Sequence, residues 1–233
     1  MSAVADALAF FAVFLFSTTL HEAAHAWAAL KGGDATAYHG GQVSLDPWPH
    51  VRRHPFGMVI LPLVSALATG WPMGFASAPY DPQWALKYPR RAAWMALAGP
   101  GTNLALAIVA ALALRAGAHF EVFYAPDRIR FGMIAASELS ATWNAIARFL
   151  SAVFSMNLLL CLFNLLPFAP LDGSAAITLF MKPETTRRYQ EFLWTTPMLT
   201  WLGLMIAWQL ADFVFHPLFL AAVSLIYPGV SYG

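Results

Sequence analysis

Two histidines and a glutamate stand close together near the start of the chain, in the motif HEAAH at residues 21–25. Residues four apart lie on the same face of an α-helix, so His21 and His25 can each direct one ring nitrogen at a single metal ion. Glu22 lies about 100° further round the helix, near enough to reach a water molecule on that ion without being a ligand. This spacing is typical of zinc hydrolases, in which the metal lowers the pKa of bound water to about 7 and a carboxylate takes its proton.

The residues that precede this motif are almost entirely apolar. The run ALAFFAVFLF, at 7–16, carries no charge. Ionisable side chains are costly inside a membrane, and there they usually mark a functional site. A metal site is therefore a better interpretation of HEAAH here than in a soluble protein, where the same pattern often arises by chance.

The composition indicates an integral membrane protein. Of 233 residues, 59% are hydrophobic and 11% are charged, against roughly 45–50% and 25% in soluble domains. A soluble core of this size could not bury so much apolar surface, so lipid must cover part of it. The net charge of +1 gives no sign of a nucleic-acid partner. The lipid bilayer is the first partner that the sequence predicts.

Several apolar runs approach the length of about 20 residues that crosses a bilayer as a helix. Four are long enough, at 4–30, 92–115, 147–167 and 194–213. A shorter run at 56–71 is interrupted by Pro62, and the tail at 216–229 reads as either a further span or an interfacial helix. We therefore expect an all-α multi-span membrane protein with about four to six transmembrane helices.

The connection at 31–55 contains glycine pairs, prolines and the short alternating stretch QVSL at 42–45. These signals predict a hairpin-like loop. A short β-hairpin and a re-entrant loop formed by 56–71 would then lie near the metal motif.

A catalytic zinc ion usually has three protein ligands and an open position. Several carboxylates and five further histidines are available, namely His39, His50, His54, His119 and His216. Asp172 is the most suggestive carboxylate, because it follows a long apolar run and stands in the proline-rich break LFNLLPFAPLDG at 162–173. Its alternative role is to cap the N-terminus of the next helix, which is common at DG turns. The residues alone favour the cap.

Three blocks in this order resemble the signature of the site-2 protease family, the zinc metalloproteases that cut within membranes: HEAAH, LAGPGTN at 97–103 and FNLLPFAPLDG at 163–173. The stretches VSLDPWPHVRRHPFGMVILP and GFASAP also resemble the compact branch of that family, which lacks a PDZ domain. The similarity covers roughly residues 17 to 180. It departs at Ser77, where many compact relatives carry lysine.

The resemblance implies a role for each matching residue. His21, His25 and Asp172 would bind one Zn²⁺, and Glu22 would be the general base. Asn164 would stabilise the oxyanion, where one amide donor can be worth about 3–4 kcal/mol. Asn103 matches the asparagine of the second block, with helix packing as its alternative role.

The three ligands can meet only if the 56–71 segment enters and leaves by the same face. A full crossing would put Asp172 about 30 Å from the histidines. In the re-entrant arrangement nine basic residues fall on the side of the metal motif: Lys31, Arg52, Arg53, Lys87, Arg90, Arg91, Lys182, Arg187 and Arg188. Four fall on the other side: Arg115, Arg128, Arg130 and Arg148. The positive-inside rule then orients the site toward the cytoplasm.

We therefore predict a single membrane-embedded metalloprotease domain over 1–233, with core blocks at 17–34, 97–103 and 163–173 and C-terminal helices at 194–233. It would hydrolyse transmembrane or membrane-proximal segments of membrane proteins, in regulated intramembrane proteolysis at the plasma membrane. The substrate would lie along an edge strand at 38–45. The alternatives are a non-catalytic zinc-binding sensor or scaffold, which would not need Glu22 and Asn164, and a metal transporter, whose ligands would be spread along a path.

Overall fold

The computed structural model describes residues 3–230, which form helices joined by loops and contain no β-sheet. The elements in chain order are α1 (Ala3–Gly32), α2 (Thr36–His39), α3 (Pro47–Arg53), the π-helix η1 (Phe56–Ile60), α4 (Leu61–Thr69), α5 (Pro82–Lys87), α6 (Pro89–His119), α7 (Ala141–Asn164), α8 (Asp172–Ala176), the 3₁₀-helix η2 (Ile177–Phe180), α9 (Pro183–Thr195) and α10 (Met198–Ile226).

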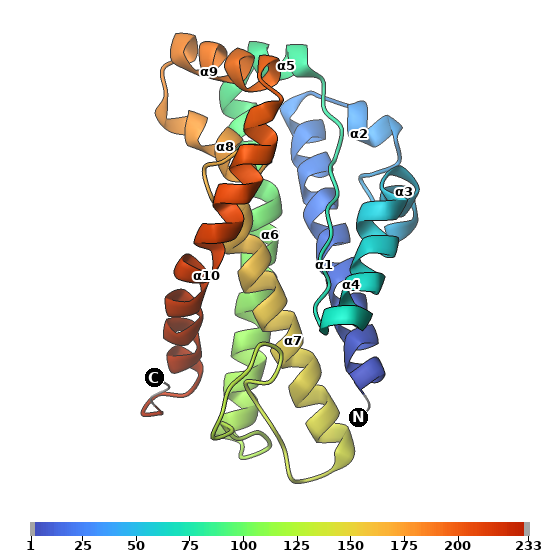
Figure 1. The fold of residues 1–233 in the computed structure, drawn as a ribbon, viewed down its shortest axis with the longest axis vertical. Coiled ribbons are helices and arrows are strands. Elements are labelled where there is room, and N and C mark those ends of the chain that lie inside the picture. The colour runs from blue at the N-terminus through green and yellow to red at the C-terminus, as the bar shows by residue number, and fades with distance from the viewer. Residues whose placement is uncertain (1–2, 231–233) are drawn as a thin grey trace.

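Within the described residues, three helices are long and apolar enough to cross a membrane, and a bent pair makes a fourth candidate. The three are α1, α6 and α7, and the fourth is α10, whose halves Met198–Ala211 and Phe213–Ile226 meet at 42°. Figure 1 shows these four helices running the length of the molecule. The expected all-α membrane protein is confirmed, and the predicted four to six spans narrow to three or four.

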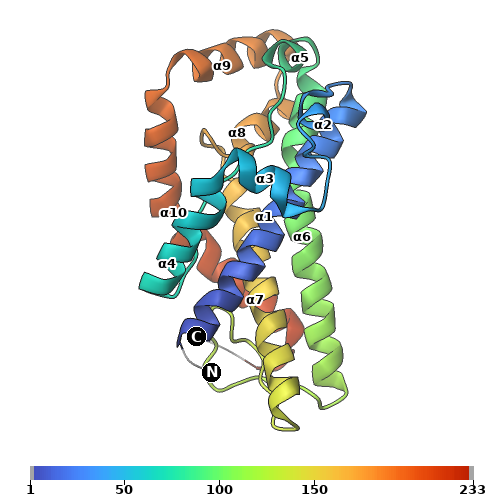
Figure 2. The same cartoon turned by 90° about the vertical axis from the view of Figure 1, so that its right-hand side faces the viewer.

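The C-terminal part differs from the two apolar runs expected there. Residues from both runs, 194–213 and 216–229, belong to α10, and Pro217 lies inside it. A proline within a helix removes one backbone hydrogen bond and clashes with the carbonyl four residues earlier, which explains a bend just before Phe213. The more polar α9 precedes α10 and lies across the end of the bundle (Figures 1 and 2).

Small residues bring α1 and α6 close together. The face of α6 that meets α1 carries a buried stripe at helical spacing: Ala92, Ala96, Gly99 and Asn103. Small side chains let helix backbones approach within a membrane, where no hydrophobic effect drives helices together. This stripe places the second sequence block directly against the metal motif on α1.

The segment between α1 and α5 enters and leaves by the same end of the bundle. The Asp81 backbone N–H donates to Asp34 Oδ2 at 2.8 Å, and Trp84 Nε1 donates to the Gly32 carbonyl at 3.1 Å. Between these anchors, η1 and α4 descend beside α1, and an extended stretch returns (Figures 1 and 2). The re-entrant arrangement is therefore confirmed, and α6 starts at the end of the molecule where α1 stops.

Asp34 holds the returning end of the re-entrant segment against the end of α1. Burial alone would raise the pKa of Asp34, but hydrogen bonds from Thr36 and from the backbone of Asp81 outweigh it and lower the pKa. The carboxylate therefore stays ionised and holds the two chain segments together.

The predicted β-hairpin is wrong. Residues 31–55 form α2 and α3, and residues 42–46 between them make no strand in the described structure. Asp46 caps α3 by accepting from the Trp48 backbone N–H at 2.9 Å, and Pro47 occupies the first turn. The glycines and prolines that indicated a hairpin turn instead mark where two short helices end and begin.

Candidate metal centre

The HEAAH motif lies in the second half of α1, facing the interior of the bundle. His21 and His25 are each 6% exposed, and Glu22 is 4% exposed. At 1.5 Å per residue, His21 lies roughly 16 Å before the end of α1 at Gly32. The motif is therefore well inside the span rather than at its tip.

Asp172 is the first residue of α8, at the end of the proline-rich break that follows α7. The N-cap of α8 is Leu171, so the alternative role of Asp172 as a helix cap is wrong. Gly173 is needed beside it, because a side chain there would collide with the carbonyls of Leu165 and Leu166. The break thus folds tightly back on the end of α7 and directs the carboxylate toward α1.

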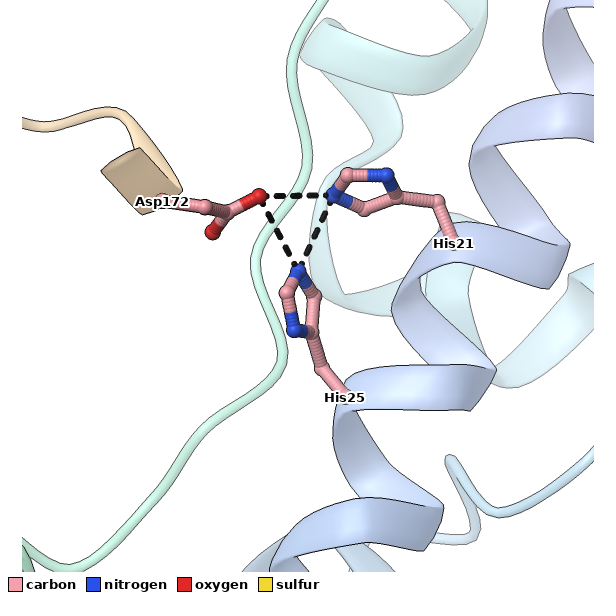
Figure 3. Close-up of side chains that lie close together, drawn as sticks. All are labelled: His21, His25 and Asp172. Atoms are coloured by element: carbon pink, nitrogen blue, oxygen red, sulfur yellow. Dashed lines mark hydrogen bonds and ion pairs between the residues drawn. The ribbon is translucent and has the colours of Figure 1, made fainter. Parts of the chain in front are cut away.

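The structure brings His21, His25 and Asp172 together, as the family resemblance implies (Figure 3). The two Nε2 atoms lie 3.0 Å apart. Asp172 Oδ2 lies 3.1 Å from Nε2 of His21 and 3.3 Å from Nε2 of His25. Ligands 2.0–2.1 Å from a tetrahedral zinc ion are roughly 3.3 Å from one another. The three atoms are therefore spaced as ligands of one small cation.

The surroundings of the two imidazoles leave their Nε2 atoms as acceptors. His25 Nδ1 lies 2.7 Å from the Met95 carbonyl, which can only accept, and His21 Nδ1 is bonded to Asn103 Oδ1. Among residues 3–230, Asp172 Oδ2 is buried and lacks a hydrogen-bond partner. For neutral imidazoles, three acceptors then face one another, and only a positive charge can stabilise that arrangement. The residues fit a zinc ion.

Gly99 of α6 forms one wall of the cluster. A side chain at this position would collide with Nε2 of both His21 and His25. Gly101, two residues later in the same helix, has open space around it instead. The glycine of the second block is therefore a packing requirement of the metal centre, consistent with the prediction that this block serves close helix packing.

The two predicted catalytic side chains lie differently. Glu22 Oε2 is buried without a hydrogen-bond partner in the described part of the chain, so one carboxylate oxygen is available to a substrate or water. Asn164 ends α7, and its amide nitrogen donates to the Leu160 carbonyl of its own helix at 3.0 Å. Asn164 is not a member of the three-residue cluster, and its oxyanion role stays a prediction.

Sequence reasoning missed the residues behind the metal site. Asn157 and Ser17 are fully buried and are connected to His21 through Asn103. The available signal was a single amide inside the apolar run SMNLLLCLF of α7, since polar residues within spans are often functional.

Comparison with known proteins gives a family. The model for "Peptidase family M50" matches residues 9–204. "Putative zinc metalloprotease YwhC" of Bacillus subtilis is 31% identical over 205 residues, which cover 85% of this chain and 83% of that protein. "Putative zinc metalloprotease Rip2" of Mycobacterium tuberculosis is 34% identical over 75% of this chain, which spans 58% of Rip2. No solved structure matches the chain.

The chain therefore belongs to peptidase family M50, and the resemblance to site-2 proteases is confirmed. Membership gives Zn²⁺ as the cofactor, with the buried cluster on α1 and α8 as its candidate site.

Proposed function

We propose that this protein is a zinc-dependent intramembrane endopeptidase that hydrolyses peptide bonds in transmembrane or membrane-proximal segments of membrane proteins. The observation that carries the proposal is the triangle formed by His21 and His25 of the spanning helix α1 with Asp172 of α8, beside the free oxygen of Glu22. A site within a spanning helix suits a substrate segment that lies in the membrane or close to it.

His21, His25 and Asp172 would hold the zinc ion, which supplies a Lewis acid that acidifies water and polarises a carbonyl. Glu22 takes the proton of the attacking water and delivers it to the leaving amine. Burial of Glu22, at 4% exposed, keeps bulk water away from the carboxylate and strengthens its local electrostatic effect. Asn164 donates its side-chain amide to the oxyanion after releasing the Leu160 carbonyl.

The substrate pairs with the extended stretch at 72–81 rather than with the stretch at 38–45. A side chain at Gly74 would collide with Phe14 of α1, and Asp81 is anchored at Asp34, so the stretch between runs past the turn of α1 that carries Glu22. By contrast, Val43 and its neighbours line a cavity of about 380 Å³ with Leu20, Ala24 and Trp27, on the side of α1 away from Glu22.

The stretch at 72–81 has backbone N–H groups that can pair with a substrate strand. The N–H groups of Met73 and Phe75 donate toward α4 and η1. Because backbone groups alternate along an extended chain, the N–H groups of Ala76 and Ala78 face the other way, and neither has a partner among the described residues. An unwound substrate segment can add to this edge as a strand.

The protein lies in the plasma membrane with the metal end toward the cytoplasm. Support comes from the excess of basic residues at that end, which the positive-inside rule assigns to the cytoplasmic side.

Cleavage of model single-span substrates by wild type and by Glu22→Gln, run in parallel, tests the proposal. The variant should retain one zinc ion per chain but cleave nothing, because its amide cannot accept the proton. Retained cleavage by Glu22→Gln would discard the role of Glu22. Zinc binding without any cleavage by wild type would favour a sensor or scaffold, and zinc flux into proteoliposomes would favour a transporter.

A further inference from the structure

Three polar side chains from three different helices form a row behind His21. They are Ser17 on α1, Asn103 on α6 and Asn157 on α7, and each is 0% exposed. Asn103 Nδ2 donates to Asn157 Oδ1 at 2.8 Å, and Asn157 Nδ2 donates to Ser17 Oγ at 2.9 Å. Buried amides are costly unless every group is paired, so this row joins the three helices only in one fully bonded arrangement.

One backbone carbonyl determines which end of each amide in the row donates and which end accepts. Asn157 Nδ2 also donates to the Val153 carbonyl at 2.8 Å, and a carbonyl can only accept. The NH₂ group of Asn157 must therefore face Val153, and its oxygen must face Asn103. Asn103 in turn presents its NH₂ group to Asn157 and its oxygen to His21 Nδ1. His21 is left with its proton on Nδ1.

We propose that Asn157 is a positioning residue of the metal centre: through Asn103 it holds His21 as the Nδ1–H tautomer and so frees Nε2 to bind zinc. The inference rests on the proposed role of His21 as a zinc ligand. His25 needs no such relay, because its Nδ1 meets the Met95 carbonyl directly at 2.7 Å. Partners of this kind behind a metal-bound histidine fix its tautomer and orientation.

Packing alone and positioning predict different results for Asn103. If Asn103 only packs helices, Asn103→Asp should be tolerated no better than Asn103→Leu, because a buried carboxylate costs more than a buried leucine. If it supplies an acceptor, Asn103→Asp should keep much more zinc affinity than Asn103→Leu, because a carboxylate presents an oxygen to His21 in either orientation, although it loses the hydrogen bond to Asn157 Oδ1.

The test is zinc affinity, measured by competition with a chelator on the full chain purified in detergent. Asn157→Leu and Asn103→Leu should each weaken zinc binding roughly 10- to 100-fold. In the Asn103→Asp background, adding Asn157→Leu should cause no further loss, because the carboxylate no longer needs to be oriented. The absorption spectrum of the cobalt(II)-substituted protein should change in Asn157→Leu and return toward wild type in the double variant.

Ser151→Ala is the matched control. Ser151 is a fully buried polar residue of the same helix, and its hydroxyl accepts from the backbone N–H groups of Ile134 and Ala135, away from His21. This variant should lower the melting temperature and leave zinc affinity unchanged.

Unchanged zinc affinity in folded Asn157→Leu would overturn the inference. So would a loss of zinc affinity on adding Asn157→Leu to Asn103→Asp that is as large as the loss on adding it to wild type. If Asn157→Leu does not fold, equal zinc affinities of Asn103→Leu and Asn103→Asp overturn it instead. If His21→Ala binds zinc like wild type, the proposed metal centre itself is wrong, independently of the role of Asn157.

Discussion

At the scale of single residues, the candidate metal centre depends on where protons and acceptors lie. The Met95 carbonyl on α6 keeps the proton of His25 on Nδ1. The Val153 carbonyl on α7 does the same for His21, because it orients Asn157 and, through it, Asn103. The Nε2 atoms and Asp172 Oδ2 are left facing one another at 3.0 to 3.3 Å. The spacing of HEAAH could predict the first two ligands, because a helix fixes which residues share a face. No spacing rule could predict Asn157, because its contacts depend on the packing of three helices.

Gly99→Ala tests the fit at atomic scale. Its methyl group would press on Nε2 of His21 and His25, so zinc affinity should fall about tenfold or more. Alanine is the better helix former by about 1 kcal/mol, so a weaker helix would not explain the loss. Isothermal titration with zinc provides the measurement.

Gly101→Ala is the control, because no atom lies within 4 Å of the added methyl group. It should bind zinc as wild type does. Equal zinc affinities for the two alanine variants would mean that the lack of a side chain at Gly99 is not needed for zinc binding.

At the scale of elements, the re-entrant segment determines which backbone faces the site. Glycine and proline signals located the break at 31–55 correctly, but they did not distinguish a hairpin from capped helices. The side chains of Asp34 and Asp46 decided that outcome, because they accept backbone N–H groups in the first turns of α2 and α3. The free edge appears at 72–81, where the prolines prevent helix formation and the anchors at both ends keep the chain extended.

Ala76→Pro tests the edge as the place where substrate pairs. Proline removes the N–H group, so kcat/KM for a single-span substrate should fall about fivefold to tenfold, the value of one hydrogen bond near 1 kcal/mol. Ala76→Val keeps the N–H group and a β-compatible side chain, so it should cleave nearly as wild type does.

Zinc affinity should be the same in both variants, since Ala76 is not part of the metal cluster. If Ala76→Pro cleaved at the wild-type rate, the pairing edge would have to lie elsewhere.

At the scale of the whole molecule, the path of the chain explains how residues far apart in sequence meet. The re-entrant segment lets α6 descend and α7 return, which brings Asp172 to the level of the motif on α1 (Figure 1). The sequence predicted this path, because only one crossing pattern places the ligands together. It did not predict that the two C-terminal apolar runs form one bent helix, since hydropathy does not report whether a helix continues through a break.

Charge is unevenly distributed between the two ends. At the end away from the metal centre, Arg148 pairs with Asp6 at 2.7 Å, and Arg115 donates to the Leu225 and Ile226 carbonyls that end α10. Both arginines are therefore held by groups of the protein itself.

Cysteine labelling tests that orientation. The native Cys161 is buried and can be replaced by alanine, after which Arg188→Cys and Arg128→Cys each place a single thiol at an exposed position. In intact cells a membrane-impermeant maleimide should label Arg128→Cys and leave Arg188→Cys unlabelled until the membrane is permeabilised. The opposite pattern would put the metal centre at the outer face.

The central claim is that His21, His25 and Asp172 share one zinc ion, and metal content tests it most directly. Elemental analysis of the full chain purified in detergent should give one zinc per chain for wild type and almost none for Asp172→Ala, provided both remain folded. One zinc per chain in folded Asp172→Ala would contradict the account.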